Sequence, residues 1–290
     1  LTSESDAATV LKTRLTKNDI PELIAMGGDS NYTELQSAGV LLDLSGEDFI
    51  SEVQDAYLEM LYDVNVDKEQ AAYGVPYATN ASGVLYNEDL FAQAGVEVPK
   101  TWSEFQDVIT KLEDAGITPF EFTFADSWTC LPPWNSMAPV IPAADFTDQR
   151  KEGKTTFVGT HEEILEKYLS LLDHAQDDFM GTTYTDGNAA FANGSAAMMI
   201  NGNWAISEFL NTNPDMNVNM FAFPSVDDES KNTVTSGVDV LFAVSNQGSE
   251  EQQEAAKEFI RYALTKDVAQ EYIDDQFAFS AVNGVEQQNE

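Results

Sequence analysis

Short, mostly apolar runs alternate with clearly marked helix starts along the whole chain, and this alternation restricts the folds that it can adopt. Apolar runs this short, placed between helices, are typical of strands that are covered on both faces. The sequence contains neither an internal repeat nor a low-complexity tract. The pattern therefore predicts an α/β fold. The expected strands are residues 23–26, 83–86, 196–200, 218–223 and 240–244.

Three helix starts have the sequence form of a capping box. In this motif a hydroxyl group and a Glu or Gln three residues later satisfy backbone N–H groups that the helix leaves free. The three boxes begin at Thr101, Thr160 and Ser249. The expected helices are residues 102–115, 161–175 and 250–264 after these boxes, with two more at 7–17 and 88–94.

Residues 123–160 differ from the rest of the chain because they are rich in proline and carry Trp128 and Trp134. We interpret them as a loop region, and loops on a rigid scaffold often carry function. Residues 63–67 resemble the opening of a calcium-binding loop, but the glycine that such a loop requires is absent. We expect a hairpin or an edge strand there instead.

Length and charge narrow the classes of function. A chain of 290 residues corresponds to about two domains. Its 50 Asp and Glu residues outnumber its 14 Lys and Arg residues, which gives a formal charge of −36. Because contacts with phosphate need clustered basic side chains, we expect no nucleic-acid partner. The same negative field favours a soluble monomer and a ligand that is neutral or cationic.

Residues that could carry metal or catalytic chemistry are few. The single cysteine, Cys130, allows neither an intramolecular disulfide nor a Cys-cluster zinc site. His161 and His174 lack the spacing of paired metal ligands. Among 50 carboxylates, any one pair has little value as a sign of acid–base catalysis. We therefore predict no metal, no cofactor and no catalytic residue.

Aromatic residues give the first indication of a ligand. Four of them lie near glycine, proline or asparagine at the ends of expected elements, namely Tyr77, Trp128, Trp134 and Trp204. An aromatic face packs well against the C–H face of a sugar ring, while Asn and Asp side chains bind the sugar hydroxyls. Taken singly, an aromatic residue is more often part of a core, because Trp and Tyr are largely buried on average.

Three blocks of sequence, in order along most of residues 20–275, resemble the extracellular sugar-binding proteins of ABC importers, the family that includes maltodextrin-binding protein. The first block is YGVPY at 73–77 with GVLYNEDLF at 83–91 and PKTWSEF at 99–105. The second is AAFANGSAAMMINGNW at 189–204. The third is FAVS at 242–245 with EAAKEFI at 254–260.

The resemblance implies a two-lobe, periplasmic-binding-protein-like fold with a ligand cleft between the lobes. Lobe 1 would comprise residues 1–84 and 239–290, and lobe 2 residues 85–238. Members of the family begin with a further strand and helix and end with further helices, so we expect these parts of lobe 1 to be missing from residues 1–290.

The resemblance also implies ligand contacts. Trp204 falls where the family commonly has an aromatic residue that stacks on sugar, and Asn80 and Asp239 fall on the two segments that cross between the lobes. The predicted ligand-binding residues are Trp204, Asn80, Asp29, Asp239, Trp128, Trp134 and Tyr77.

The function that the resemblance implies is that of an extracellular solute-binding component of an ABC importer. It would capture a neutral sugar or oligosaccharide by hinge closure and deliver it to the permease subunits. We expect an extracellular or periplasmic location, with anchoring to the cell surface through a segment upstream of residue 1. Two alternatives remain: a secreted carbohydrate-active enzyme that uses paired carboxylates, and a binding protein for another solute such as a polyamine or a peptide.

Overall fold

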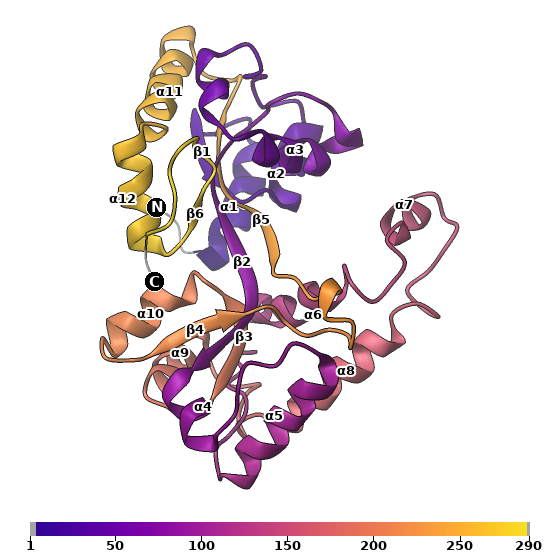
Figure 1. Ribbon diagram of the computed structural model, residues 1–290. Helices are drawn as coiled ribbons and strands as arrows, with labels where there is room; N and C mark the ends of the chain where they lie inside the picture. Colours follow the sequence, from indigo (N-terminus) through magenta and orange to yellow (C-terminus); the bar gives the residue numbers. More distant parts are fainter. Residues whose placement is uncertain (1–3, 289–290) are drawn as a thin grey trace. The chain divides into compact units, whose positions relative to one another are not determined.

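A computed structural model describes residues 4–288, and their contacts divide the chain into two compact units (Figure 1). Unit 1 contains the residues up to Asn80 and those from Gly237 onward, and unit 2 contains Ala81–Ser236. Strands β2 (Val75–Asn87) and β5 (Thr235–Val244) carry the chain across the two boundaries. The crossings expected after residues 84 and 238 lie on these same two strands.

Unit 1 is built on part of a β-sheet, with helices packed against it. Strand β5 lies between β1 (Leu23–Met26), to which it is antiparallel, and β2. The short strand β6 (Phe279–Ser280) pairs with β2 through Ala78 and Thr79. The helices described in this unit are α1 (Glu4–Thr16), α2 (Ser30–Ser37), α3 (Asp55–Val64), α11 (Glu250–Ala263) and α12 (Lys266–Gln276), with the short 3₁₀ helices η1 (Asp48–Glu52) and η2 (Val66–Lys68).

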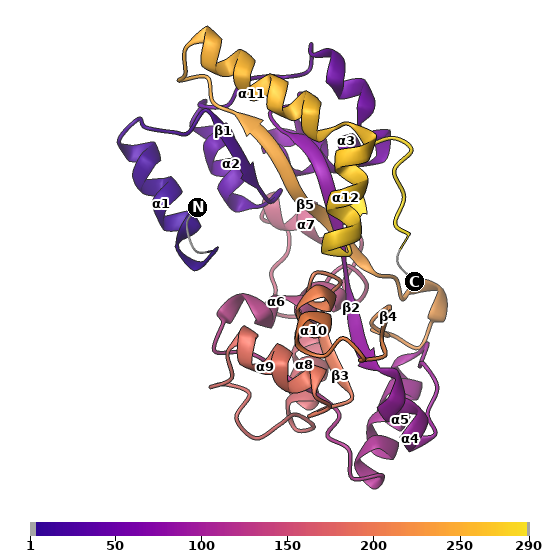
Figure 2. The ribbon, with the colours of Figure 1, turned by 90° about the vertical axis from the view of Figure 1, so that its left-hand side faces the viewer.

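Alternate residues of β5 enter two different cores, as the two-residue period of a strand requires. Phe242 and Val244 pack in the cluster that contains buried residues of α11 and α12. Leu241 and Ala243 pack in the cluster that contains buried residues of α2. The sheet of unit 1 is therefore covered on both faces, and Figure 2 shows α11 and α12 lying across it.

Unit 2 uses the second part of β2 as its central strand. Strands β3 (Met198–Gly202) and β4 (Val218–Phe221) pair with it on opposite edges, and Val84 faces both Ile200 and Phe221. Leu85 packs with α9 and α10, while Val84 packs in the other core of this unit. The helices described here are α4 (Glu88–Ala94), α5 (Trp102–Asp114), α6 (Leu131–Met137), α7 (Phe146–Lys151), α8 (Glu162–Leu172), α9 (Tyr184–Ala192) and α10 (Ala205–Thr212), with the 3₁₀ helices η3 (Ser127–Cys130) and η4 (Glu229–Lys231).

Two of the three predicted capping boxes are confirmed, and the third is wrong. The boxes that begin at Thr101 and Ser249 have both of their reciprocal hydrogen bonds. At Thr160 the hydroxyl group donates instead to the carbonyl oxygens of Thr156 and Phe157. Helix α8 therefore begins without a side-chain cap, and Glu162 accepts a hydrogen bond from the N–H of Gly159.

The interpretation of residues 123–160 as a loop region is wrong in part, because η3, α6 and α7 lie within them. Pro132 and Pro133 occupy the first turn of α6. Proline is tolerated there, because the N–H groups of a first helical turn have no partner within the helix.

The hairpin or edge strand expected at residues 63–67 is also wrong, because α3 ends at Val64 and η2 follows it. The side chain of Asn65 organises this segment. It accepts a hydrogen bond from the hydroxyl of Tyr32 and donates to the carbonyl oxygens of Glu69 and Ala71. One buried amide thus satisfies the carbonyl oxygens of Glu69 and Ala71, which need no strand partner.

Candidate functional site

Trp204 lies in the tight turn between strand β3 and helix α10, where its half-buried ring rests on the backbone of the strand end. A Cβ atom placed on Gly202 would overlap three carbon atoms of the six-membered ring of this indole. The ring therefore lies directly against the Cα of Gly202, and a glycine is needed there because any larger residue would displace the ring.

Trp204 belongs to a group of three aromatic rings that come from three separate segments. The ring centroid of Trp128, on η3, lies 6.4 Å from that of Trp204 and 4.9 Å from that of Tyr184, the first residue of α9. The ring planes are inclined by 50° and 57°. All three side chains are half-buried, so this three-ring group presents aromatic surface while it is held by its surroundings.

Asp126 joins two of these segments. One of its carboxylate oxygens accepts a hydrogen bond of 2.6 Å from the backbone N–H of Tyr184, and its carbonyl oxygen accepts one from Thr129. These bonds hold the start of α9 against the segment that carries Trp128. Tyr184 is not among the residues predicted from the sequence, because no local pattern distinguishes it from the other tyrosines of the chain. Its contact with Trp128 bridges 56 positions and exists only in the folded protein.

Asn80 and Asp239 form a polar pair in unit 1. They lie on strands β2 and β5, and the Nδ2 of Asn80 donates a hydrogen bond of 2.9 Å to the Oδ1 of Asp239. Both side chains are half-buried. Burial, and after it the negative charge of Asp239, raises the pKa of the Tyr272 hydroxyl. The structure thus brings together two of the residues that the resemblance implied.

Asp239 and Tyr77 line a cavity of about 470 Å³ in unit 1. Its wall is mainly aromatic and aliphatic, and its charged group is the carboxylate of Asp239. Tyr77 itself is 4% exposed, and its hydroxyl contacts the carbonyl oxygen of Val268. The other lining residues are Ala25, Met26, Gly27, Val240, Phe242, Phe259, Tyr262, Ala263, Val268 and Tyr272.

The remaining two predicted residues, Asp29 and Trp134, lie in neither group. Asp29 caps α2, where its carboxylate accepts hydrogen bonds from the N–H groups of Asn31 and Tyr32. Trp134 is half-buried on α6 and stacks on His161, with ring centroids 5.6 Å apart and planes inclined by 16°. Both side chains have local structural partners that account for their positions.

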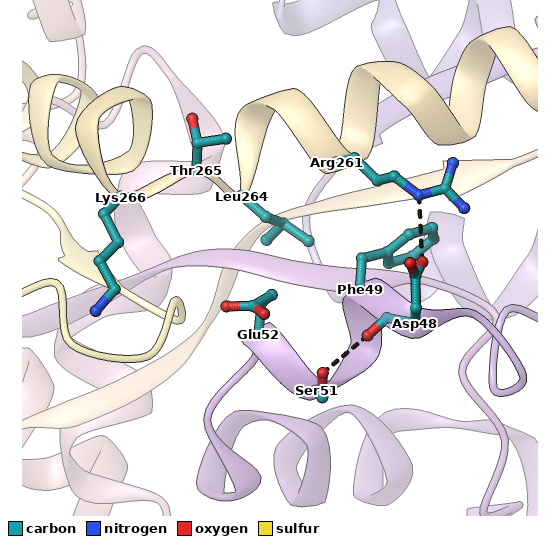
Figure 3. A pocket seen from close by; sticks show the side chains of 8 residues that line it. All are labelled: Asp48, Phe49, Ser51, Glu52, Arg261, Leu264, Thr265 and Lys266. Carbon is teal, nitrogen blue, oxygen red and sulfur yellow. Dashed lines mark hydrogen bonds and ion pairs between the residues drawn. The ribbon is translucent and has the colours of Figure 1, made fainter.

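A second hollow of unit 1, of about 590 Å³, lies beside η1 and the corner between α11 and α12 (Figure 3). Charged side chains dominate it. The guanidinium of Arg261 pairs with Asp48 at 3.2 Å and lies 5.3 Å from the ring centre of Phe49. The charge of this hollow suits a neutral sugar less well than aromatic walls do, and none of the predicted site residues lines it.

The described part of the chain offers neither a metal cluster nor a membrane-spanning helix. Among the side chains that the structure describes, no group of three or more His, Cys, Asp or Glu could hold a metal ion. Within the same residues, no helix is both long enough and apolar enough to cross a membrane.

Comparison with known proteins identifies several relatives. The chain is similar to the multiple sugar-binding protein of Streptococcus mutans, with 29% identity over 295 residues that cover 98% of this chain and 68% of the relative. Among solved structures it is similar to RafE in complex with raffinose, with 27% identity and a TM-score of 0.84, over 98% of this chain and 74% of that one. The apo form of RafE from Streptococcus pneumoniae gives 26% identity and a TM-score of 0.76, over 100% of this chain and 74% of that one.

A chitin oligosaccharide binding protein shares the fold, with a TM-score of 0.84 and 24% identity over 98% of this chain and 72% of that one. The expected α/β fold of the periplasmic-binding-protein type is thereby confirmed. The family model described as bacterial extracellular solute-binding protein matches residues 2–290. This chain therefore belongs to the bacterial extracellular solute-binding proteins, which confirms the family resemblance found in its sequence.

Proposed function

We propose that this protein is the extracellular sugar receptor of an ABC importer, which captures a neutral sugar or oligosaccharide and delivers it to a membrane permease. The observation that carries the proposal is the three-ring group of Trp128, Tyr184 and Trp204 in a member of the solute-binding family. Half-buried aromatic faces bind the C–H surface of a sugar ring without requiring charge on the ligand.

The chemistry of the remaining groups agrees with a neutral ligand. The pair of Asn80 and Asp239 offers an amide and a carboxylate, which bind hydroxyl groups well. A formal charge of −36 disfavours anionic sugars. The relatives named above include proteins described as binding raffinose, chitin oligosaccharide and multiple sugars. These descriptions support a carbohydrate over a polyamine or a peptide.

We assign binding and transport to this protein, and no catalytic step. Its relatives are binding proteins. Among its fifty carboxylates, no feature of the sequence distinguishes one pair as catalytic. We place the protein outside the cytoplasmic membrane, as the name of its family indicates. We further propose that it acts as a monomer and is anchored at the cell surface.

A thermal-shift screen over neutral mono- and oligosaccharides tests the proposed function. A ligand at 100 times its dissociation constant should add about 2.7 kcal/mol of stability, and the sugar should be recovered unchanged. Chromatography of the same samples supplies the control for turnover. Cleavage of a glycan would support the enzyme alternative, and stabilisation by polyamines or peptides alone would support the other one.

Replacing Gly202 with alanine is expected to weaken sugar binding about 10-fold, which corresponds to about 1.4 kcal/mol, because the new Cβ displaces the indole of Trp204. Calorimetric titration measures the effect. Gly46→Ala is the matched control, since a Cβ at Gly46 meets nothing within 4 Å. If Gly202→Ala bound sugar as tightly as the wild type, the position of the Trp204 indole against Gly202 would have no part in sugar recognition.

Ligand binding is expected to reduce the radius of gyration while the secondary structure stays unchanged. Hinge closure moves rigid units about a few connecting residues, as is known for periplasmic binding proteins, and here β2 and β5 are the connecting strands. Small-angle scattering with and without saturating sugar measures the change, and far-UV circular dichroism is the control. An equal radius in both states would exclude closure.

A further inference from the structure

We propose that Asn203 is a positioning residue, which fixes the ring of Trp204 and connects it to the strand that leaves unit 2. The proposal rests on the sugar contact assigned to Trp204 under the proposed function. It assigns to Asn203 a role that differs from ligand contact, because the side chain is 4% exposed and its Oδ1 accepts a hydrogen bond from the N–H of Ala81.

Asn203 extends the pairing of β3 with β2 by one residue beyond the end of β3. The last pair of the ladder is Gly202 with Ser82. One position further, the N–H of Asn203 donates to the carbonyl oxygen of Ala81 at 3.0 Å. The N–H of Ala81 donates in return to the side-chain Oδ1 of Asn203 at 2.8 Å. The side chain thus replaces the backbone acceptor that a continuing strand would supply.

The same residue also begins the next helix. The carbonyl oxygen of Asn203 accepts a hydrogen bond of 3.1 Å from the N–H of Ile206, in the first turn of α10. Trp204 stands at the cap position of α10 and forms no side-chain cap bond. The hydrogen bonds of Asn203 therefore fix the backbone that leads into Trp204, and the ring of Trp204 lies against the backbone of Gly202.

Ala81, to which Asn203 is bonded, lies at the boundary between the two units. It is the first residue of unit 2 along β2, and its neighbour Asn80 is the last residue of unit 1 on that strand. Asn80 is in turn bonded to Asp239 on β5. If the backbone at Trp204 moves on sugar binding, the two hydrogen bonds between Asn203 and Ala81 would transmit this movement to strand β2 at the boundary.

Fluorine NMR of the full chain labelled with 5-fluorotryptophan tests the positioning role without any ligand. Asn203→Ala should shift or broaden the resonance of Trp204, identified with Trp204→Phe, and leave that of Trp102 unchanged. An unchanged Trp204 resonance in Asn203→Ala would overturn the proposal.

Asn87 supplies a matched control. Like Asn203 it is a buried asparagine. It ends strand β2, and its side chain accepts hydrogen bonds from the N–H groups of Asp89 and Leu90 at the start of α4. Asn87→Ala should lower the melting temperature by a similar amount, because each variant loses one structural asparagine. It should leave the Trp204 resonance unchanged, and a shift equal to that in Asn203→Ala would show a general loss of rigidity instead.

A double-mutant cycle on sugar affinity tests the coupling. Asn203→Ala should weaken binding about 10-fold in the wild type and by less than about 2-fold in Trp204→Ala, because its effect acts through that ring. Equal losses in the two backgrounds would overturn the coupling. If the wild type bound no sugar at all, the proposed function would fail, and the fluorine spectra would still decide the role of Asn203.

Discussion

Replacing Trp204 with alanine is expected to weaken sugar binding by about 2 to 4 kcal/mol, the range of an aromatic residue that dominates a binding surface. This corresponds to about 30- to 1000-fold in the dissociation constant. The ring is half-buried, rests on Gly202 and lies beside Trp128, so its removal takes away a contact surface that is already in place. Isothermal titration with the sugar found in the melting screen measures the loss.

The opposite result would follow if Trp204 served only the core. Truncation of a core Trp costs roughly 3 to 5 kcal/mol of stability, with or without ligand. Trp102→Ala is the matched control, because Trp102 is also half-buried in unit 2 and packs against Phe105 and Phe223. It should lower the melting temperature and leave the affinity unchanged. If Trp204→Ala behaved like this control, the stacking assignment would be wrong.

Replacing Gly83 with alanine is expected to destabilise the protein by about 3 kcal/mol, the upper part of the usual range for overpacking. A Cβ at Gly83 would overlap the carbonyl oxygen of Phe221 on β4. This neighbour is a backbone atom, so relief of the overlap requires the strands β2 and β4 to separate. Urea-induced unfolding measures the free-energy difference.

Gly237 offers the control for this substitution, since it also lies on a long strand, β5, and a Cβ there meets nothing within 4 Å. Gly237→Ala should leave the unfolding free energy nearly unchanged. Equal effects of the two substitutions would mean that the close approach of β4 to Gly83 does not contribute to stability.

Regular elements could be predicted from the sequence where their signals are local, while seven of the described α-helices, among them α2, α9 and α12, were not expected. Strand β1 was expected at its observed bounds, and two capping boxes marked the starts of α5 and α11. The prediction failed where the same residues suit two structures. Prolines 132 and 133 indicate a loop when they are counted by composition, yet they fit the first turn of α6.

The candidate site could be predicted only in part. Trp204 and Trp128 stood out in the sequence, and the structure places their rings together. Tyr184 and Asn203 did not stand out, because each acts through a partner far along the chain. Tyr184 meets Trp128 across 56 positions, and Asn203 binds Ala81 across 122. Such pairs depend on tertiary packing, which no local periodicity encodes.

We expect this chain to bind a neutral sugar without changing it, and calorimetric titration followed by analysis of the recovered sugar tests this most directly. The expected result is saturable binding of one sugar molecule per chain, with all of the sugar recovered intact after prolonged incubation. Binding that requires a charged solute in place of a sugar, or the appearance of hydrolysis products, would contradict it.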